Sequence, residues 1–163
     1  MQLLERLNIV LGRVTAWMTV LMVVVTFVIV VMRYAFDSGW IWLQESVTWM
    51  HAAVFMLAAA YTLARDEHVR VDVFYRGFSP QKKALIDALG AALFMIPFCA
   101  FLVWSSLDYV GVSWSIQESS REAGGLVFPF PSILKTLIPI MAVTLMAQAV
   151  VMLARSIVTI RGD

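Results

Sequence analysis

Apolar residues fill four long stretches of the chain, and charged residues gather between them. No Asp, Glu, Lys or Arg occurs in 14–32, 47–64, 88–104 or 136–154. Each stretch holds 17 to 19 residues, so as a helix it covers about 25–28 Å, close to the ~30 Å hydrocarbon core of a bilayer. The pattern predicts an all-α integral membrane protein with four transmembrane helices.

With flanking residues included, the spans fall in a single membrane domain that covers 1–163. We place them at about 14–32, 43–64, 84–104 and 133–155. Residues 1–13 place Leu and Val at helical spacing between polar residues, which predicts an amphipathic lead at the membrane surface.

Two connections between the spans also have a pattern. Residues 65–83 mix Val and Phe with charges, and we interpret them as an interfacial helix because a lone strand would leave backbone groups unpaired. Residues 105–132 remain as the second long loop. Leu107, Val110 and Trp114 nevertheless continue a helical spacing, so the third helix is expected to extend beyond the membrane edge or to tilt strongly.

Composition narrows the class of protein. Apolar residues make up 61% of the 163-residue chain and charged residues 14%, with a mean hydropathy of +0.85. A soluble domain of this size has too little interior for so much apolar surface. Disorder, a soluble enzyme and a nucleic-acid binder are therefore unfavourable interpretations.

The basic residues predict the orientation. The side with both termini and the middle loop carries nine: Arg6, Arg13, Arg65, Arg70, Arg76, Lys82, Lys83, Arg155 and Arg161. The other side carries only Arg33, Arg121 and Lys135. Because short cytoplasmic loops are enriched in Lys and Arg, we expect both termini and residues 65–83 in the cytoplasm and the other two loops outside.

Local signals mark helix ends and irregularities. Ser79-Pro80 is typical of an N-cap followed by proline in the first turn. Ser119 and Glu122 have the spacing of a capping box. Pro97 and Pro139 lie inside the third and fourth spans, where each is expected to kink its helix.

Few residues in the spans could carry chemistry. His51 is the one residue of the uncharged stretches that titrates near neutrality. We interpret it as a neutral imidazole bonded to a neighbouring helix, with a proton-relay or ligand histidine as the alternative. The two histidines and single cysteine supply a metal site poorly, and no nucleophile–base pair or phosphate loop is recognisable, so neither a cofactor nor an enzymatic activity is expected.

Glu45 lies near the outer end of the second span. We interpret it as a first-turn carboxylate that the helix dipole stabilises, paired with Arg33, or as a contact to a partner subunit. The hypothesis is that these two residues hold together the outer ends of the helices, or hold the partner. Lys135 is interpreted as snorkelling outward, and Lys82 with Lys83 as an anchor to anionic lipid.

The assembled pattern resembles the small membrane subunit, DctQ-like, of the tripartite ATP-independent periplasmic (TRAP) transporters. The resemblance covers nearly the whole chain in order. It rests on Arg33-Tyr34, Phe36, Trp42, Glu45, Arg65, His68-Val69-Arg70-Val71-Asp72, Ser119, Gly125-Leu126, Phe128-Pro129 and Pro139.

The resemblance implies a role and partners. In this family a periplasmic solute-binding protein delivers an organic acid, and a large inner-membrane subunit imports it by sodium symport. The small subunit would be the fixed scaffold that stabilises the large one, with no substrate or sodium site of its own. The candidate partner-interface or fold-critical residues are then Arg33, Tyr34, Trp42, Glu45, His68 and Asp72.

Two other functions stay open. One is an autonomous multidrug/proton antiporter, although Glu45 lies closer to the interface than such a carboxylate should. The other is the membrane anchor of a respiratory enzyme. His51 and His68 would lie about 25 Å apart along one helix, too far to ligate one haem within the chain.

Overall fold

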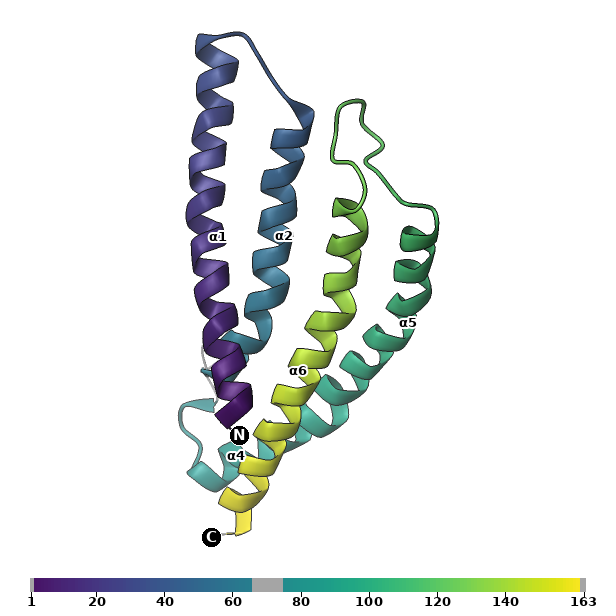
Figure 1. Cartoon of the computed structure of the whole chain (residues 1–163). Coiled ribbons are helices and arrows are strands. Elements are labelled where there is room, and N and C mark those ends of the chain that lie inside the picture. The colour runs from purple at the N-terminus through teal and green to yellow at the C-terminus, as the bar shows by residue number, and fades with distance from the viewer. Residues whose placement is uncertain (1, 66–74, 162–163) are drawn as a thin grey trace.

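The computed structural model describes residues 2–65 and 75–161, with side chains of the first helix described from Ile9 onward. All regular structure in these residues is helical (Figure 1). Four helical runs are long and apolar enough to cross a membrane. They are Ile9–Ala35, Ile41–Ala64, Pro80–Ser115 and Phe130–Arg161. The predicted all-α membrane fold with four spans is confirmed.

Helix α1 (Gln2–Ala35) joins the N-terminal lead and the first span into one helix of 34 residues, about 51 Å long. The expected amphipathic lead is thus continuous with the first span, and its place at the membrane surface stays a prediction. Gly12 does not interrupt it, because one glycine is tolerated in a helix. That glycine has a packing reason: a Cβ there would lie 2.7 Å from a ring carbon of Tyr61.

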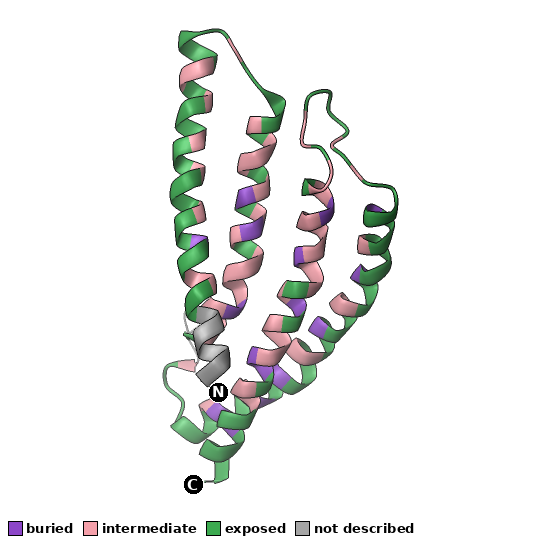
Figure 2. Cartoon of the chain, viewed as in Figure 1, coloured by how far each residue is buried: buried purple, intermediate pink, exposed green. Residues whose placement is uncertain are grey.

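The helices form one layer in the order α1, α2, α6, α5 (Figure 1). Helix α2 (Ile41–Ala64) packs on α1 and on α6 (Phe130–Arg161), and α6 packs on α5 (Ile96–Ser115). Small side chains allow these approaches: Ala53, Ala60, Ala142 and Ala149 are almost completely buried. Most other residues keep an exposed side, as Figure 2 shows.

The third run consists of α4 (Pro80–Gly90), a π-helical turn η1 (Ala91–Met95) and α5. Its start confirms the predicted cap, because the Ser79 hydroxyl accepts from the backbone amide of Lys82 at 3.4 Å. The π turn lies directly before Pro97, whose ring would otherwise clash with the carbonyl four residues earlier. Helix α6 continues through Pro139 as one element.

This run holds 36 residues, about 54 Å of helix, so it exceeds the bilayer thickness unless it tilts. The helical spacing past residue 104 had indicated this extension. Because α5 ends at Ser115 and α6 begins at Phe130, the second long connection is 116–129 rather than the whole of 105–132.

Both termini lie at one end of the layer, and the connections 36–40 and 116–129 lie at the other (Figure 1). We call these the terminal end and the loop end. Residues 66–74 of the expected interfacial segment 65–83 lie outside the described residues, and its last four residues belong to α4. Next to it, the Tyr75 hydroxyl donates to Oδ2 of Asp87 at 2.7 Å.

Candidate functional site: a clasp at the loop end

Glu45, in the first turns of α2, holds the connection between α5 and α6. Its Oε1 accepts a hydrogen bond from the Ser120 hydroxyl at 2.5 Å, and its Oε2 accepts from the backbone amide of Leu126 at 2.6 Å. These partners lie 75 and 81 residues away in sequence. One carboxylate thus fixes two points of the connection against α2, and bonds to a charged acceptor are among the stronger ones.

The connection is folded back on itself around that carboxylate. The Ser120 amide donates to the Leu126 carbonyl at 2.7 Å, and the Phe128 amide donates to the Ser119 hydroxyl at 3.1 Å. The Trp42 amide lies in the first turn of α2 and so has no acceptor within its own helix; it donates to the Gly124 carbonyl at 3.0 Å. We call this arrangement of Trp42, Glu45, Ser120, Gly124, Gly125 and Leu126 the clasp.

The two glycines of the clasp are required by its geometry. Gly124 has a φ of +80°, which glycine adopts without strain. A Cβ on Gly125 would lie 2.5 Å from the Ser120 hydroxyl oxygen and 2.6 Å from Oε2 of Glu45. The carboxylate and the connection can approach this closely only because that side chain is absent.

A second set of polar contacts joins α5 to α6 beside the clasp. The hydroxyls of Ser113 and Ser132, both buried, lie 3.0 Å apart, and Ser132 also donates to the Ser113 carbonyl. Lys135 forms an ion pair with Glu118 at 2.5 Å and lies 4.0 Å from the ring centroid of Tyr109. Hydrogen bonds from Lys135 and Ser113 hold the pKa of Glu118 below its ordinary value.

Two tryptophans complete the loop end. The indole of Trp49 donates to the Phe130 carbonyl at 2.8 Å, which joins α2 to the start of α6. The indole of Trp114 donates to the Thr136 hydroxyl at 3.0 Å, and its ring meets Phe128 edge-on. Polar contacts thus connect α2, α5 and α6 at this end.

The candidate residues fall in different places. Glu45 and Trp42 belong to the clasp, whereas Arg33 and Tyr34 lie at the exposed end of α1. Among the described residues Glu45 has Ser120 and Leu126 as partners and forms no ion pair with Arg33, so the expected pair is corrected. The hydrogen bonds to the Glu45 carboxylate come instead from the connection 116–129, which is folded over the start of α2.

Other interpretations are also resolved. The spacing of Ser119 and Glu122 is not a capping box: Ser119 binds Phe128, and the Glu122 amide donates to Ser120 at 3.1 Å in a turn. Lys135 does not simply snorkel outward, because it pairs with Glu118. His68 and Asp72 lie outside the described residues.

Sequence reasoning did not find Ser120, Ser113 or Ser132. A serine near the end of an apolar helix carries no signal of a partner 19 residues away. The doubled Gly124-Gly125 was the one available signal, since adjacent glycines mark a tight turn or a close backbone approach.

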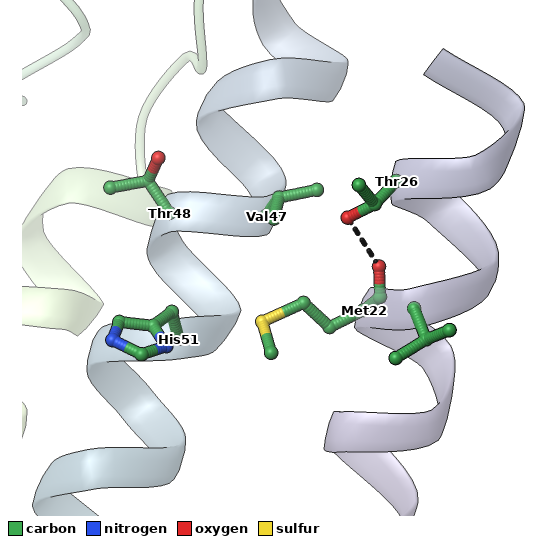
Figure 3. Close-up of a pocket in the computed structure, with 6 residues that line it drawn as sticks. Met22, Thr26, Val47, Thr48 and His51 are labelled. Carbon is green, nitrogen blue, oxygen red and sulfur yellow. Dashed lines mark hydrogen bonds between the residues drawn. The ribbon is translucent and has the colours of Figure 1, made fainter. Parts of the chain in front are cut away.

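His51 lies outside the clasp, on the exposed side of α2. It lines a groove with Met22, Val23 and Thr26 of α1 and with Val47 and Thr48 of α2 (Figure 3). The groove has a volume of 460 Å³. No described residue forms a hydrogen bond with the imidazole, so the expected bond to a neighbouring helix of this chain is absent from the described structure.

Comparison with known proteins identifies the family. The family model for the DctQ component of the tripartite ATP-independent periplasmic transporters matches residues 22–159. The chain belongs to this family. The match runs from the middle of α1 to the end of α6, so it includes the clasp and the groove. This DctQ-family chain is thus a transport component and a multi-pass protein of the bacterial inner membrane.

One curated relative is the C4-dicarboxylate TRAP transporter small permease protein DctQ of Vibrio cholerae. The DctQ-family chain is 30% identical to it over 88 residues, which are 54% of this chain and 38% of that protein. The alignment thus spans well under two thirds of the relative.

Proposed function

We propose that this chain is the fixed scaffold subunit of a TRAP importer and that it stabilises the large transport subunit. The observation that carries the proposal is the Glu45 clasp. A subunit against which another one moves must resist sliding of its own helices. The clasp supplies that resistance, because it joins α2 to the connection between α5 and α6 through one carboxylate.

The single layer of helices supports the same role. A compact four-helix bundle hides most of its side chains. Here the main helix pairs among the described residues are α1–α2, α2–α6 and α6–α5, and α4, which leads into α5, also packs on α6. Both faces of such a layer remain available to lipid and to another membrane subunit. A flat frame of this kind offers a large contact area for its mass.

The proposed cargo is an organic acid, imported with sodium after delivery by a periplasmic solute-binding protein. The name of the Vibrio cholerae relative makes a four-carbon dicarboxylate such as succinate the first substrate to test. In the proposed orientation the terminal end faces the cytoplasm, in keeping with nine basic residues on that side against three. The loop end with its clasp then faces the periplasm and the binding protein.

Reconstitution tests this proposal. The chain, the large permease from the same genome and their binding protein are placed in liposomes with an inward sodium gradient, and uptake of radiolabelled succinate and other organic acids is measured. We expect uptake only when all three proteins and sodium are present. Transport by this chain alone would support an autonomous carrier instead, and full uptake without the chain would refute the scaffold role.

A clasp variant links the structure to that assay. Glu45→Ala removes both hydrogen bonds of the carboxylate and should reduce both the recovery of the complex and the uptake. Glu122→Ala, which removes an exposed carboxylate of the same connection that forms none of the clasp bonds, is the matched control and should behave as wild type. If the two variants gave equal recovery of the complex and equal uptake, the clasp would not be what supports the scaffold role.

A further inference from the structure

The exposed side of α2 is a narrow stripe that is unusually polar for a membrane helix. Past the first turn, the exposed residues of α2 are Gln44, Thr48, His51 and Phe55, spaced four, three and four positions apart. This is the spacing of a single helix face. Three of its four side chains are polar, and we call this surface the α2 stripe.

His51 makes the stripe costly to expose to lipid. It lies nine residues beyond Trp42, about 14 Å along the helix, near the middle of a ~30 Å hydrocarbon core. An imidazole is too short to reach the interface from there, and each of its nitrogens needs a partner. Within the described structure it has none.

The nearby threonine hydroxyls, unlike the imidazole, have hydrogen-bond acceptors within their own helices. The hydroxyl of Thr26 donates to the Met22 carbonyl at 2.7 Å, and that of Thr48 lies 3.5 Å from the Gln44 carbonyl. Such bonds within one helix let a hydroxyl face lipid. Unlike these hydroxyls, the His51 imidazole needs a hydrogen-bond partner that the described part of this chain does not supply.

The exposed stripe of α6 shows what a surface suited to lipid looks like. Its exposed residues past the first turns include Ile140, Val143 and Val150, all apolar. Ile140 lies ten residues from the start of α6, as His51 does from the start of α2, and both helices start at the loop end. At matched depth one helix exposes an aliphatic side chain and the other an imidazole.

We propose that the α2 stripe binds a transmembrane helix of the large permease, and that this helix offers His51 a hydrogen-bonding side chain. The assignment rests on the proposed function above. Lipid tails contain no hydrogen-bonding group, whereas Ser, Thr, Asn or Gln on a facing helix would satisfy the imidazole. The 460 Å³ groove between α1 and α2 has room for side chains of that helix (Figure 3).

The position of the stripe agrees with this use. Gln44 at its top is the neighbour of Glu45, so a helix lying on the stripe would contact α2 directly below the clasp. Its docking surface would then be the part of α2 that the connection 116–129 holds in place. A rigid surface loses less conformational freedom on association.

Spin labelling of the assembled complex tests the assignment. In a Cys99→Ala background, a nitroxide is attached at Thr48→Cys or, as the control at similar depth, at Ile140→Cys. Oxygen accessibility is measured in liposomes for the chain alone and with the large permease. We expect the label at 48 to lose most of its accessibility on assembly while the label at 140 keeps it.

A second experiment addresses His51 itself. His51→Leu should weaken the complex about 3- to 20-fold, the range of one interhelical hydrogen bond in a membrane, while the helix content and melting temperature of the isolated chain stay unchanged. His51→Gln should restore part of the affinity, because an amide also donates and accepts. Ile140→Leu is the control and should have no effect.

Each outcome decides between the possibilities. If the large permease does not bind the wild-type chain, the proposed function fails. If it binds but the label at 48 stays accessible, only the stripe assignment fails. Protection at 48 without the permease, caused by a second copy of the chain, would also overturn the assignment, as would an unaltered affinity in His51→Leu.

Discussion

The hairpins α1–α2 and α5–α6 are held together by different means. Helices α5 and α6 share the buried Ser113–Ser132 contact and the Glu118–Lys135 ion pair. Helices α1 and α2 instead meet through close packing, with Gly12 under the ring of Tyr61 and with Met22 and Val47 pointing between the helices (Figure 3). The clasp then connects the second hairpin to α2 and leaves α1 outside.

The two hairpins also differ in how much of their surface is buried. Of the most apolar 18-residue window in α1 only 6% is buried, against 22% in α6. Helix α1 therefore lies at the edge of the layer with Val, Leu and Phe exposed to lipid, while polar contacts hold α2, α5 and α6 together as a frame. Polar contacts at the loop end should thus matter much more for the frame than for the packing of α1.

Gly125→Ala should have the largest effect. The added Cβ would overlap both Ser120 and Glu45, so the connection must move away and lose both carboxylate bonds. We expect a loss of about 2–4 kcal/mol in the free energy of unfolding, measured by denaturant titration in mixed micelles. Gly77→Ala, where nothing lies within 4 Å, is the control; equal losses in the two variants would contradict the clasp.

Glu45→Ala should cost about 1–3 kcal/mol, because the two bonds are lost without added strain. Hydrogen exchange should rise at the amide of Leu126. Arg33→Ala should stay within about 0.5 kcal/mol of wild type, as exposed substitutions usually do. A larger loss for Arg33 than for Glu45 would reverse the comparison between the two hairpins.

Ser132→Ala tests the buried tie between α5 and α6. It removes the hydroxyl that faces Ser113, and the expected loss is about 0.6–2 kcal/mol. Ser115→Ala is the control, since that hydroxyl donates at 2.8 Å to the Val112 carbonyl of its own helix. If the two variants unfold alike, packing alone holds the second hairpin and the contrast with α1–α2 disappears.

Much of this fold was predictable because spans, caps and helix extension are local or compositional properties. Uncharged runs mark the four spans, Ser79-Pro80 marks a helix start, and the spacing from Leu107 to Trp114 marks the extension of α5. The clasp was only half predictable. Glu45 stood out as a carboxylate near the membrane, but its partners Ser120 and Leu126 are 75 and 81 residues away, and no local pattern encodes such a pairing. His51 stood out as a titratable residue in an uncharged span, and its lack of a partner among the described residues emerged only from the packing.

The smallest effect concerns pH and the Glu118–Lys135 pair. Because hydrogen bonds from Lys135 and Ser113 hold the pKa of Glu118 below its ordinary value, the folded chain binds this proton less readily than the unfolded chain. The pair therefore stabilises the fold at any pH above the pKa that this carboxyl has in the unfolded chain. The stabilisation is lost as the pH falls through the lower pKa of the folded chain. Glu118→Gln should reduce stability at pH 7 and flatten its decline as pH falls below the unfolded pKa of the carboxyl, as measured by melting temperature in detergent. Glu122→Gln, an exposed carboxylate of the same connection, should keep the wild-type slope. If Glu118→Gln retains that slope as well, the ion pair adds nothing to the second hairpin, and the buried serines and the clasp carry the difference between the two hairpins.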